Sequence, residues 1–160
     1  MALDRKRRRI VTRPAEEIDF YTVGYQGRDI VSFVASLTQA RVETLLDIRF
    51  TPVSMYKPAF SRKNLETALS AAGIDYLHMP DLGVPSEVRK QAAQSGRRSD
   101  IWAWYDEYVV SRFAEGNLDW FFNSANHPIA MMCVERDPRD CHRHLLADAL
   151  SRHGLISRDI

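Results

Sequence analysis

The stretch PIAMMCVERDPRDCHRHLLADALSRHG, residues 128–154, decides what kind of fold this chain adopts. Its first seven residues, 128–134, form a continuous apolar run, which is typical of a buried strand. Residues 141–154 place apolar side chains at helical spacing, with Asp140 as the expected N-cap and Gly154 at the C-cap. The stretch therefore predicts a strand, a polar loop and a helix, in that order.

The rest of the chain repeats this order of elements. Strands are predicted at 18–23, 44–48 and 74–79. Helices are predicted at 30–37, 61–73, 100–113 and 117–125, and the polar segment 86–99 is a weak helix or a mobile flap. This alternation predicts an α/β fold: a single Rossmann-like three-layer domain, with a mainly parallel sheet of about four to five strands and helices on both faces.

Composition sets the broad class of the protein. The 160 residues are 45% hydrophobic and 27% charged, as expected for one globular domain, which we place at residues 17–160. No apolar run is long enough to span a membrane, so no membrane partner is expected. Two cysteines are too few for a disulfide framework, which favours reduced thiols and a cytoplasmic location.

The N-terminus differs from the rest of the chain in charge. Residues 1–16 are predicted to be a basic, disordered tail. Its cations could bind nucleic acid by neutralising phosphates, and the residues concerned are Arg5, Lys6, Arg7, Arg8 and Arg9. The chain as a whole has a net charge of only +1, so the domain behind the tail is mildly acidic.

Candidate site residues lie at or just past the ends of three of the predicted strands. Gly24 and Tyr25 follow the first strand, Asp47 and Arg49 end the second, and Cys133 and Glu135 end the last. In an open parallel sheet, ligands bind outside the carboxyl ends of the strands. We therefore expect these residues to meet at one edge of the sheet and to bind a small anionic or nucleotide-type ligand there.

The segment 133–144 contains both cysteines and allows three kinds of site. Cys133, Cys141, His142 and His144 have the donor atoms for zinc, but their spacing matches no familiar zinc motif. Three of them crowded onto one helical turn would also point in different directions. The sequence therefore predicts no metal and no cofactor.

The second kind of site is a phosphate-binding nucleophile loop. Cys133 and Arg139 have the C-x5-R spacing of cysteine phosphatases. The intervening VERDP lacks glycine, contains a proline without an N–H, and has two carboxylates that would repel phosphate.

The third kind of site is a helix terminus. Cys141 would lie at the first position of the helix, where the dipole and the nearby Arg136, Arg139 and Arg143 lower a thiol pKa. The plain structural alternative is that both cysteines are packed in the core.

Five segments also resemble a known family. They are TVGYQGRDIVSFV (22–34), LLDIRFTPVS (45–54), FSRKNL (60–65), AGIDYLHMPDLG (72–83) and MCVERDPRDCHRHLLADAL (132–150). Their order and motifs are similar to the domain of unknown function family 488, whose closing motif is C-x-E-x-x-P-x-x-C-H-R. Arg139 lies outside that motif. The strand followed by D-I-R also looks like the start of a rhodanese domain, without that family's cysteine loop.

The resemblance implies a Rossmann-like domain and a site at the motif positions, namely Asp47, Arg49, Pro52, Ser54, Cys133, Glu135, Cys141, His142 and Arg143. Asp47 and Glu135 would position or deprotonate a ligand, Arg49 and Arg143 would hold its negative charge, and a cysteine would be the nucleophile in covalent chemistry. Family members are sometimes labelled as DNA-repair proteins. The alternative function is therefore a nucleic-acid-binding or DNA-repair-associated module that uses the basic tail.

Overall fold

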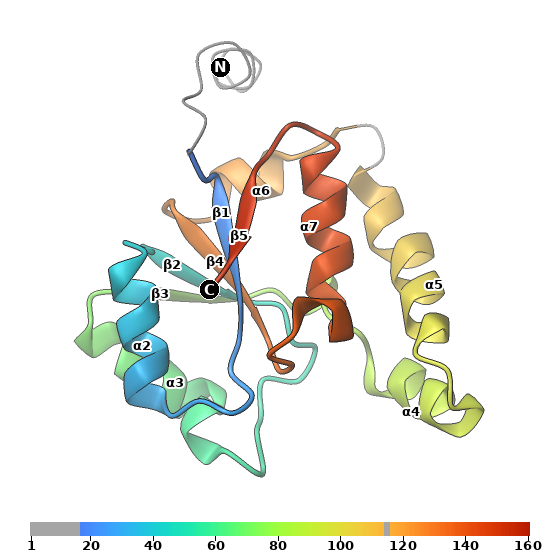
Figure 1. Ribbon diagram of the computed structural model, residues 1–160, viewed down its shortest axis with the longest axis horizontal. Helices are drawn as coiled ribbons and strands as arrows, with labels where there is room; N and C mark the ends of the chain where they lie inside the picture. The colour runs from blue at the N-terminus through green and yellow to red at the C-terminus, as the bar shows by residue number, and fades with distance from the viewer. Residues whose placement is uncertain (1–16, 114–115) are drawn as a thin grey trace.

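A five-stranded parallel sheet forms the centre of the computed structural model, which describes residues 17–113 and 116–160 (Figure 1). Its strand order is β3-β2-β4-β1-β5. The strands are β1 Phe20–Gly24, β2 Thr44–Asp47, β3 Asp75–His78, β4 Ile129–Cys133 and β5 Ser157–Asp159. The predicted α/β fold with a parallel sheet is confirmed. The predicted basic tail, including Arg5 to Arg9, lies outside the described residues.

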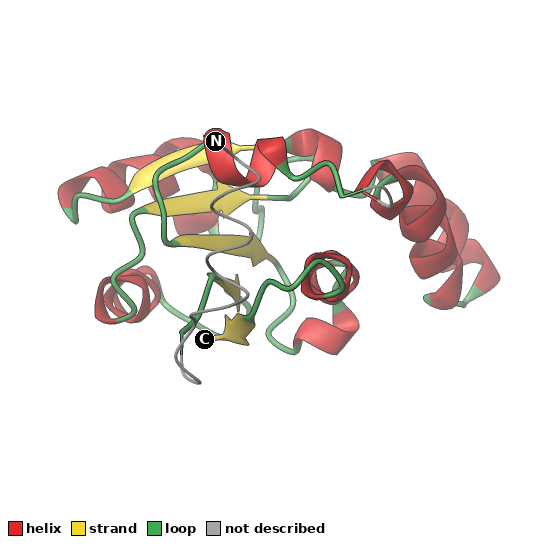
Figure 2. Ribbon diagram, turned by 90° about the horizontal axis from the view of Figure 1, so that it is seen from above, coloured by secondary structure: helices red, strands yellow, loops and turns green. Residues whose placement is uncertain are grey.

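Helices cover both faces of the sheet and complete three layers (Figure 2). One face is covered by α2 Ile30–Gln39 and α3 Arg62–Ala71. The other is covered by α5 Ser99–Tyr108, α6 Asp119–Asn123 and α7 Arg143–Ser151. The remaining helix, α4 Ser86–Ser95, packs against α5. Within the described residues no helix is both long enough and apolar enough to cross a membrane.

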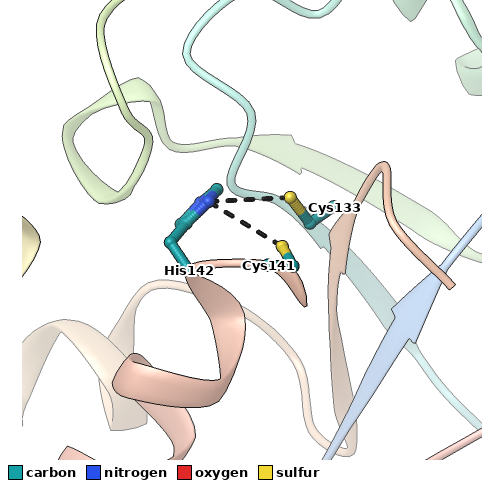
Figure 3. A group of neighbouring side chains, drawn as sticks. All are labelled: Cys133, Cys141 and His142. Carbon is teal, nitrogen blue, oxygen red and sulfur yellow. Dashed lines mark hydrogen bonds between the residues drawn. The ribbon is translucent and has the colours of Figure 1, made fainter. Parts of the chain in front are cut away.

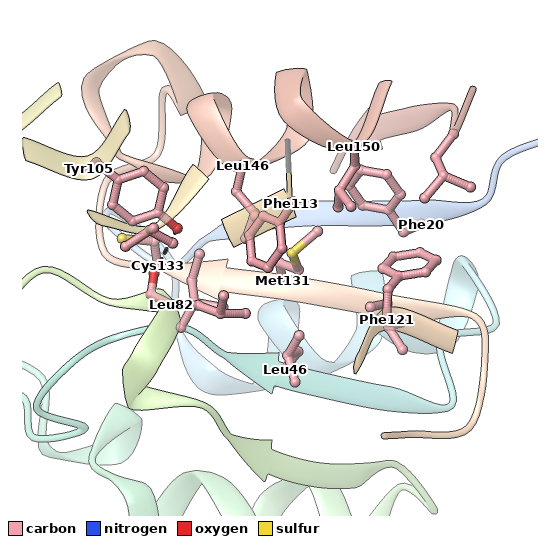
Figure 4. Close-up of a cluster of buried hydrophobic side chains, with 14 of the residues drawn as sticks. Phe20, Leu46, Leu82, Tyr105, Phe113, Phe121, Met131, Cys133, Leu146 and Leu150 are labelled. Carbon is pink, nitrogen blue, oxygen red and sulfur yellow. Dashed lines mark hydrogen bonds between the residues drawn. The ribbon is translucent and has the colours of Figure 1, made fainter. Parts of the chain in front are cut away.

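The central strand β4 explains why the sheet has helices on both sides. Ile129, Met131 and Cys133 belong to the apolar cluster under α5, α6 and α7 (Figure 4). Ala130 and Met132 belong to the cluster under α2 and α3. Successive strand residues point to opposite faces, so a strand covered on both faces must be apolar at every position. This is the continuous run that the sequence shows.

The strand register brings four strand ends to one edge of the sheet. Gly24 pairs with Cys133, Asp47 pairs with Met132, and Asp47 also pairs with His78. Because β4 lies between β1 and β2, the loop that follows Cys133 leaves from the middle of this edge. The expected convergence of polar residues at the carboxyl edge is confirmed.

The start of α7 differs from the prediction. The helix begins at Arg143 with His142 as N-cap, and Asp140 does not cap it. Instead Pro138–Asp140 is a short 3-10 turn, in which Asp137 accepts a hydrogen bond of 2.9 Å from the backbone N–H of Arg139. Proline favours the first position of such a turn. Cys141 is consequently extended, with φ −128° and ψ 148°, and lies ahead of the helix.

Three other elements of the structure differ from the predicted elements or settle an alternative that the sequence left open. The segment that could have been a flap forms α4. Helix α7 ends at Ser151, and Gly154, with φ +85°, lies beyond its C-cap. The edge strand β5 was missed because it has only three residues, Ser157–Asp159, and all are polar or charged.

Candidate functional site

A small cavity of about 70 Å³ lies at the carboxyl edge of the sheet. Arg49 comes from the loop after β2, Cys133 ends β4, and Glu135 lies in the loop that follows β4. Cys141 and His142 precede α7. The opposite wall comes from α4, α5 and the turn between them. One water needs only about 10–15 Å³, so this volume fits a small molecule or ion. It is far below the roughly 300–1,000 Å³ typical of pockets for drug-sized ligands.

Two sulfurs and an imidazole meet on the wall of this cavity (Figure 3). His142 Nδ1 lies 3.7 Å from Cys133 Sγ and 3.8 Å from Cys141 Sγ. The three donor atoms all lie within 4.8 Å of one another, on side chains that are 4%, 2% and 8% exposed for Cys133, Cys141 and His142. The expectation that these side chains diverge is therefore wrong. It assumed that Cys141 belongs to the helical turn, whereas its extended backbone turns the sulfur towards Cys133.

The tautomer of His142 follows from its second contact. His142 Nε2 lies 3.3 Å from the backbone carbonyl oxygen of Ile48. A carbonyl oxygen can only accept a hydrogen bond, so Nε2 bears the hydrogen. In the neutral ring, Nδ1 then has a free lone pair directed at the two sulfurs. The ring of Tyr105 lies 5.0 Å away and helps to bury the imidazole.

The two thiols are electrostatically different. Burial and the adjacent Cys141 sulfur raise the pKa of Cys133. Burial also acts to raise the pKa of Cys141, but the hydrogen bond from Cys133 and the contact with His142 lower it well below its ordinary value. The Cys141 sulfur also accepts the backbone N–H of Arg143 at 3.5 Å. Of the two sulfurs, Cys141 is the one whose surroundings favour a thiolate.

Asp47 forms a closed network with its neighbours. It accepts hydrogen bonds from Arg49 Nε at 2.9 Å, Arg49 Nη2 at 2.7 Å, the Arg49 backbone N–H at 3.1 Å and the Tyr76 hydroxyl at 2.6 Å. Burial acts to lower the pKa of Arg49, but the bonds to Asp47 raise it overall. Burial and the bond to Asp47 raise the pKa of Tyr76. Asp47 therefore positions Arg49, whose side chain lines the cavity.

Glu135 lines the cavity, whereas Arg143 lies outside it. Cys133 Sγ lies 3.5 Å from Glu135 Oε2, and burial together with the Cys141 sulfur raises the pKa of Glu135. Arg143 is fully buried, and its guanidinium donates to the backbone carbonyls of Glu135 and Arg136 and to Asp159. The Arg143 side chain thus links the loop after β4 to α7 and β5 through hydrogen bonds. Arg143 does not line the cavity.

The other sequence-predicted residues support the loops around the cavity. A Cβ on Gly24 would lie 1.8 Å from the Glu135 carbonyl oxygen, so glycine is required for the close approach of this loop. Tyr25 is buried and stacks on Phe60, with ring centroids 4.5 Å apart.

Pro52 and Ser54 lie in the loop after β2. The Pro52 carbonyl accepts the Arg62 N–H at 2.8 Å, and the Ser54 backbone N–H donates to Ser61 at 3.0 Å. Neither residue lines the cavity at the carboxyl edge, and Ser54 lines a separate hollow together with Tyr25.

Sequence reasoning missed Arg89, Arg98 and Trp102, which line the wall formed by α4 and α5. Arg98 pairs with Asp140 at 3.1 Å. Among the described residues, no carboxylate lies within ion-pair distance of Arg89. The sequence shows that this segment is basic. It does not show that the segment lies against the carboxyl edge, because that position depends on the packing of α4 on α5.

The fold and the site define the class: a three-layer α/β domain with a cysteine–histidine cluster and arginines at the carboxyl edge of a parallel sheet. The chain belongs to the family described as Domain of unknown function DUF488, whose model matches residues 29–150. That range includes every sequence-predicted site residue except Gly24 and Tyr25. No curated protein and no solved structure matches the chain, and no match supports the likeness to rhodanese domains.

Proposed function

We propose that this domain is enzyme-like and binds a small anion in the cavity at the carboxyl edge. The observation behind the proposal is that Arg49, Arg89 and Arg98, from three separate segments, line the same cavity as both sulfurs. Guanidinium groups suit carboxylate, phosphate and sulfate because their N–H groups match paired oxygens. The cavity volume of about 70 Å³ favours a small anion over a whole nucleotide.

Arg89 is the cation most available to such a ligand. Arg49 is engaged by Asp47 and Arg98 by Asp140, whereas the guanidinium of Arg89, within the part of the chain that the structure describes, donates a 3.5 Å hydrogen bond to Ser86 Oγ and has no carboxylate partner. A salt bridge already satisfies much of a guanidinium's binding capacity, so an added anion gains most from an arginine that lacks one. Arg89 should therefore contribute more to anion binding than either of the other two.

Thiol chemistry is the second part of the proposal and applies to the metal-free protein. Cys141 would be the attacking sulfur, because it lines the cavity and has the lone pair of His142 Nδ1 3.8 Å away to accept its proton. A thiol with an adjacent base that is oriented by a third group is the usual arrangement for nucleophilic catalysis. The Ile48 carbonyl is that third group.

Anion binding can be tested by thermal shift with inorganic phosphate and sulfate, in the presence of a metal chelator. A ligand that binds only the folded state raises the melting temperature. We expect the shift to be lost in Arg89→Gln and retained in Lys90→Gln, a matched control with the same charge change on the same helix. Equal shifts in both variants, or no shift in the wild type, would refute the anion site.

The thiol part is tested by alkylation of the metal-free protein with iodoacetamide and peptide mapping. We expect Cys141 to react faster than Cys133 and faster than free cysteine, and phosphate to slow that reaction. If neither thiol reacts faster than free cysteine, covalent thiol catalysis is excluded.

The alternative of a nucleic-acid-binding or DNA-repair-associated module stays a prediction, because the basic residues on which it depends lie outside the described residues. A cytoplasmic location also belongs to the proposal. Both cysteines are free, and thiols remain reduced in that compartment.

A further inference from the structure

We propose that Cys133, Cys141 and His142 bind a zinc ion, with a fourth coordination position open to the cavity. The ligands would be the two Sγ atoms and Nδ1 of the imidazole. The inference rests on the proposed function only for what occupies the fourth position. The site itself follows from the positions of the three donor atoms.

The distances between the donor atoms fit a tetrahedral ion. Zinc lies about 2.3 Å from sulfur and about 2.0–2.1 Å from nitrogen, which at tetrahedral angles separates the sulfur and nitrogen by about 3.6 Å. The observed separations are 3.7 Å from Nδ1 to Cys133 Sγ and 3.8 Å to Cys141 Sγ. The two sulfur–nitrogen separations therefore lie within about 0.2 Å of the tetrahedral value. The two sulfurs lie within 4.8 Å of each other, and they would have to be about 3.8 Å apart to share one ion.

The surroundings of the cluster suit metal ligands. A zinc-bound histidine usually donates its other ring N–H to a carbonyl or carboxylate, which fixes the ring and directs the lone pair at the metal. His142 does this through Nε2 and the Ile48 carbonyl. Cys141 Sγ accepts the backbone N–H of Arg143, a contact that stabilises a thiolate. Sulfur and imidazole donors together favour zinc over magnesium or calcium.

Charge balance also favours a divalent ion. Burying two thiolates without a partner is costly, but two thiolates and a neutral imidazole around Zn²⁺ have no net charge. Binding displaces the thiol protons to solvent, and both sulfur lone pairs then form bonds to the metal. The same sulfur cannot serve as a ligand and as a free nucleophile, so zinc would protect both cysteines from alkylation.

The open fourth position makes the proposed site resemble a catalytic zinc site and not a structural one. Structural zinc sites have four protein ligands, whereas catalytic sites have three and keep a position for water or substrate; two cysteines and one histidine form one such set. All three proposed ligands line the cavity, which they share with Glu135. A water or small anion in the fourth position would share the cavity with Glu135 and with the arginine wall. The substrate class is a small oxyanion or a compound attacked by metal-bound water.

The test uses the full chain, purified, stripped with a chelator and reloaded with zinc. We expect one zinc ion per chain by elemental analysis after gel filtration. Cobalt in place of zinc should give intense thiolate-to-metal absorption bands. These two measurements need no variant. Sub-stoichiometric zinc, or a cobalt spectrum without thiolate bands, would overturn the proposal, as would a protein that binds iron or copper but not zinc.

Variants then assign the ligands. Cys141→Ser and His142→Gln should lose the stoichiometric metal, while His153→Gln, at a histidine that lies just beyond the C-terminal end of α7, should retain it. Far-UV circular dichroism establishes that each variant is folded. Retention of zinc by folded Cys141→Ser and His142→Gln would overturn the assignment.

The two proposals can fail separately. Anion binding is measured on chelator-treated protein with Arg89→Gln, and zinc binding on metal-loaded protein with Cys141→Ser. Zinc binding that persists in Arg89→Gln, with the phosphate shift lost, supports both sites. A phosphate shift without stoichiometric zinc overturns the metal site alone, and zinc without any phosphate shift overturns the anion site alone.

Discussion

Replacing Asp47 by asparagine should destabilise the protein severely. Asp47 is fully buried, and the Arg49 side chain beside it is only 4% exposed. The carboxylate accepts three N–H groups of Arg49 and the Tyr76 hydroxyl. Asparagine has nearly the same shape but no charge, and its amide group would face donors. Arg49 would then be a buried cation without a counterion.

Removing one partner of a buried ion pair costs about 3–5 kcal/mol. Urea m-values of small proteins are about 1–3 kcal/mol/M, so with a value near 2 the unfolding midpoint should fall by about 1.5–2.5 M. Equilibrium urea unfolding followed by circular dichroism measures this shift. Adding Arg49→Met to Asp47→Asn should restore part of the lost stability, because the unpaired charge is then gone.

The chain contains its own control for this experiment. Asp137 and Arg139 repeat the same local pattern, with bonds from the backbone N–H at 2.9 Å, Nε at 3.2 Å and Nη2 at 2.9 Å, but on the surface. Exposed ion pairs are screened by water, so Asp137→Asn should shift the midpoint far less than Asp47→Asn. Similar shifts for the two variants would refute the argument that burial makes the Asp47–Arg49 pair essential.

Three further results are expected. Gly24→Ala should lower the melting temperature by an amount equivalent to at least about 1–3 kcal/mol, because its Cβ would lie 1.8 Å from the Glu135 carbonyl oxygen; an unchanged melting temperature would contradict this. Tyr105→Phe should cost about 1–3 kcal/mol in urea unfolding, since the buried Leu82 carbonyl loses a 2.8 Å hydrogen bond. The nucleic-acid alternative predicts that deleting residues 1–13 abolishes DNA or RNA binding that weakens with salt, and binding that survives the deletion would count against it.

The parallel sheet could be predicted because its central strands are covered on both faces. The run at 129–133 is apolar at every residue, and such a pattern has few alternatives in a chain with intervening helices. The edge strand Ser157–Asp159 could not be predicted in this way. Its side chains are solvated or, like Asp159, bonded to distant groups such as Arg143, and local sequence does not reveal a distant partner.

The site residues at the ends of β2 and β4 were predictable, but the wall formed by α4 and α5 and the geometry of the cysteine–histidine cluster were not. That Asp47, Cys133 and Glu135 lie at one edge follows from strand polarity alone. The direction of the Cys141 side chain depends on whether residue 140 caps a helix or closes a turn. Aspartate is suited to either role, and Pro138 decides for the turn. Because the backbone of Cys141 is extended and not helical, its sulfur lies close to Cys133 and His142, and the three donor atoms converge.

The loop between the two cysteines is held in place by the protein itself. Arg143 donates to two carbonyls of this loop and to Asp159, and Gly24 lets the loop lie against β1. Ordering a loop costs conformational entropy, and a ligand that must order its own site binds more weakly. Here that ordering is part of folding, so a metal or an anion would meet donors that are already in place. Weakening the contacts of the Arg143 guanidinium should therefore reduce zinc affinity, even though Arg143 does not line the cavity.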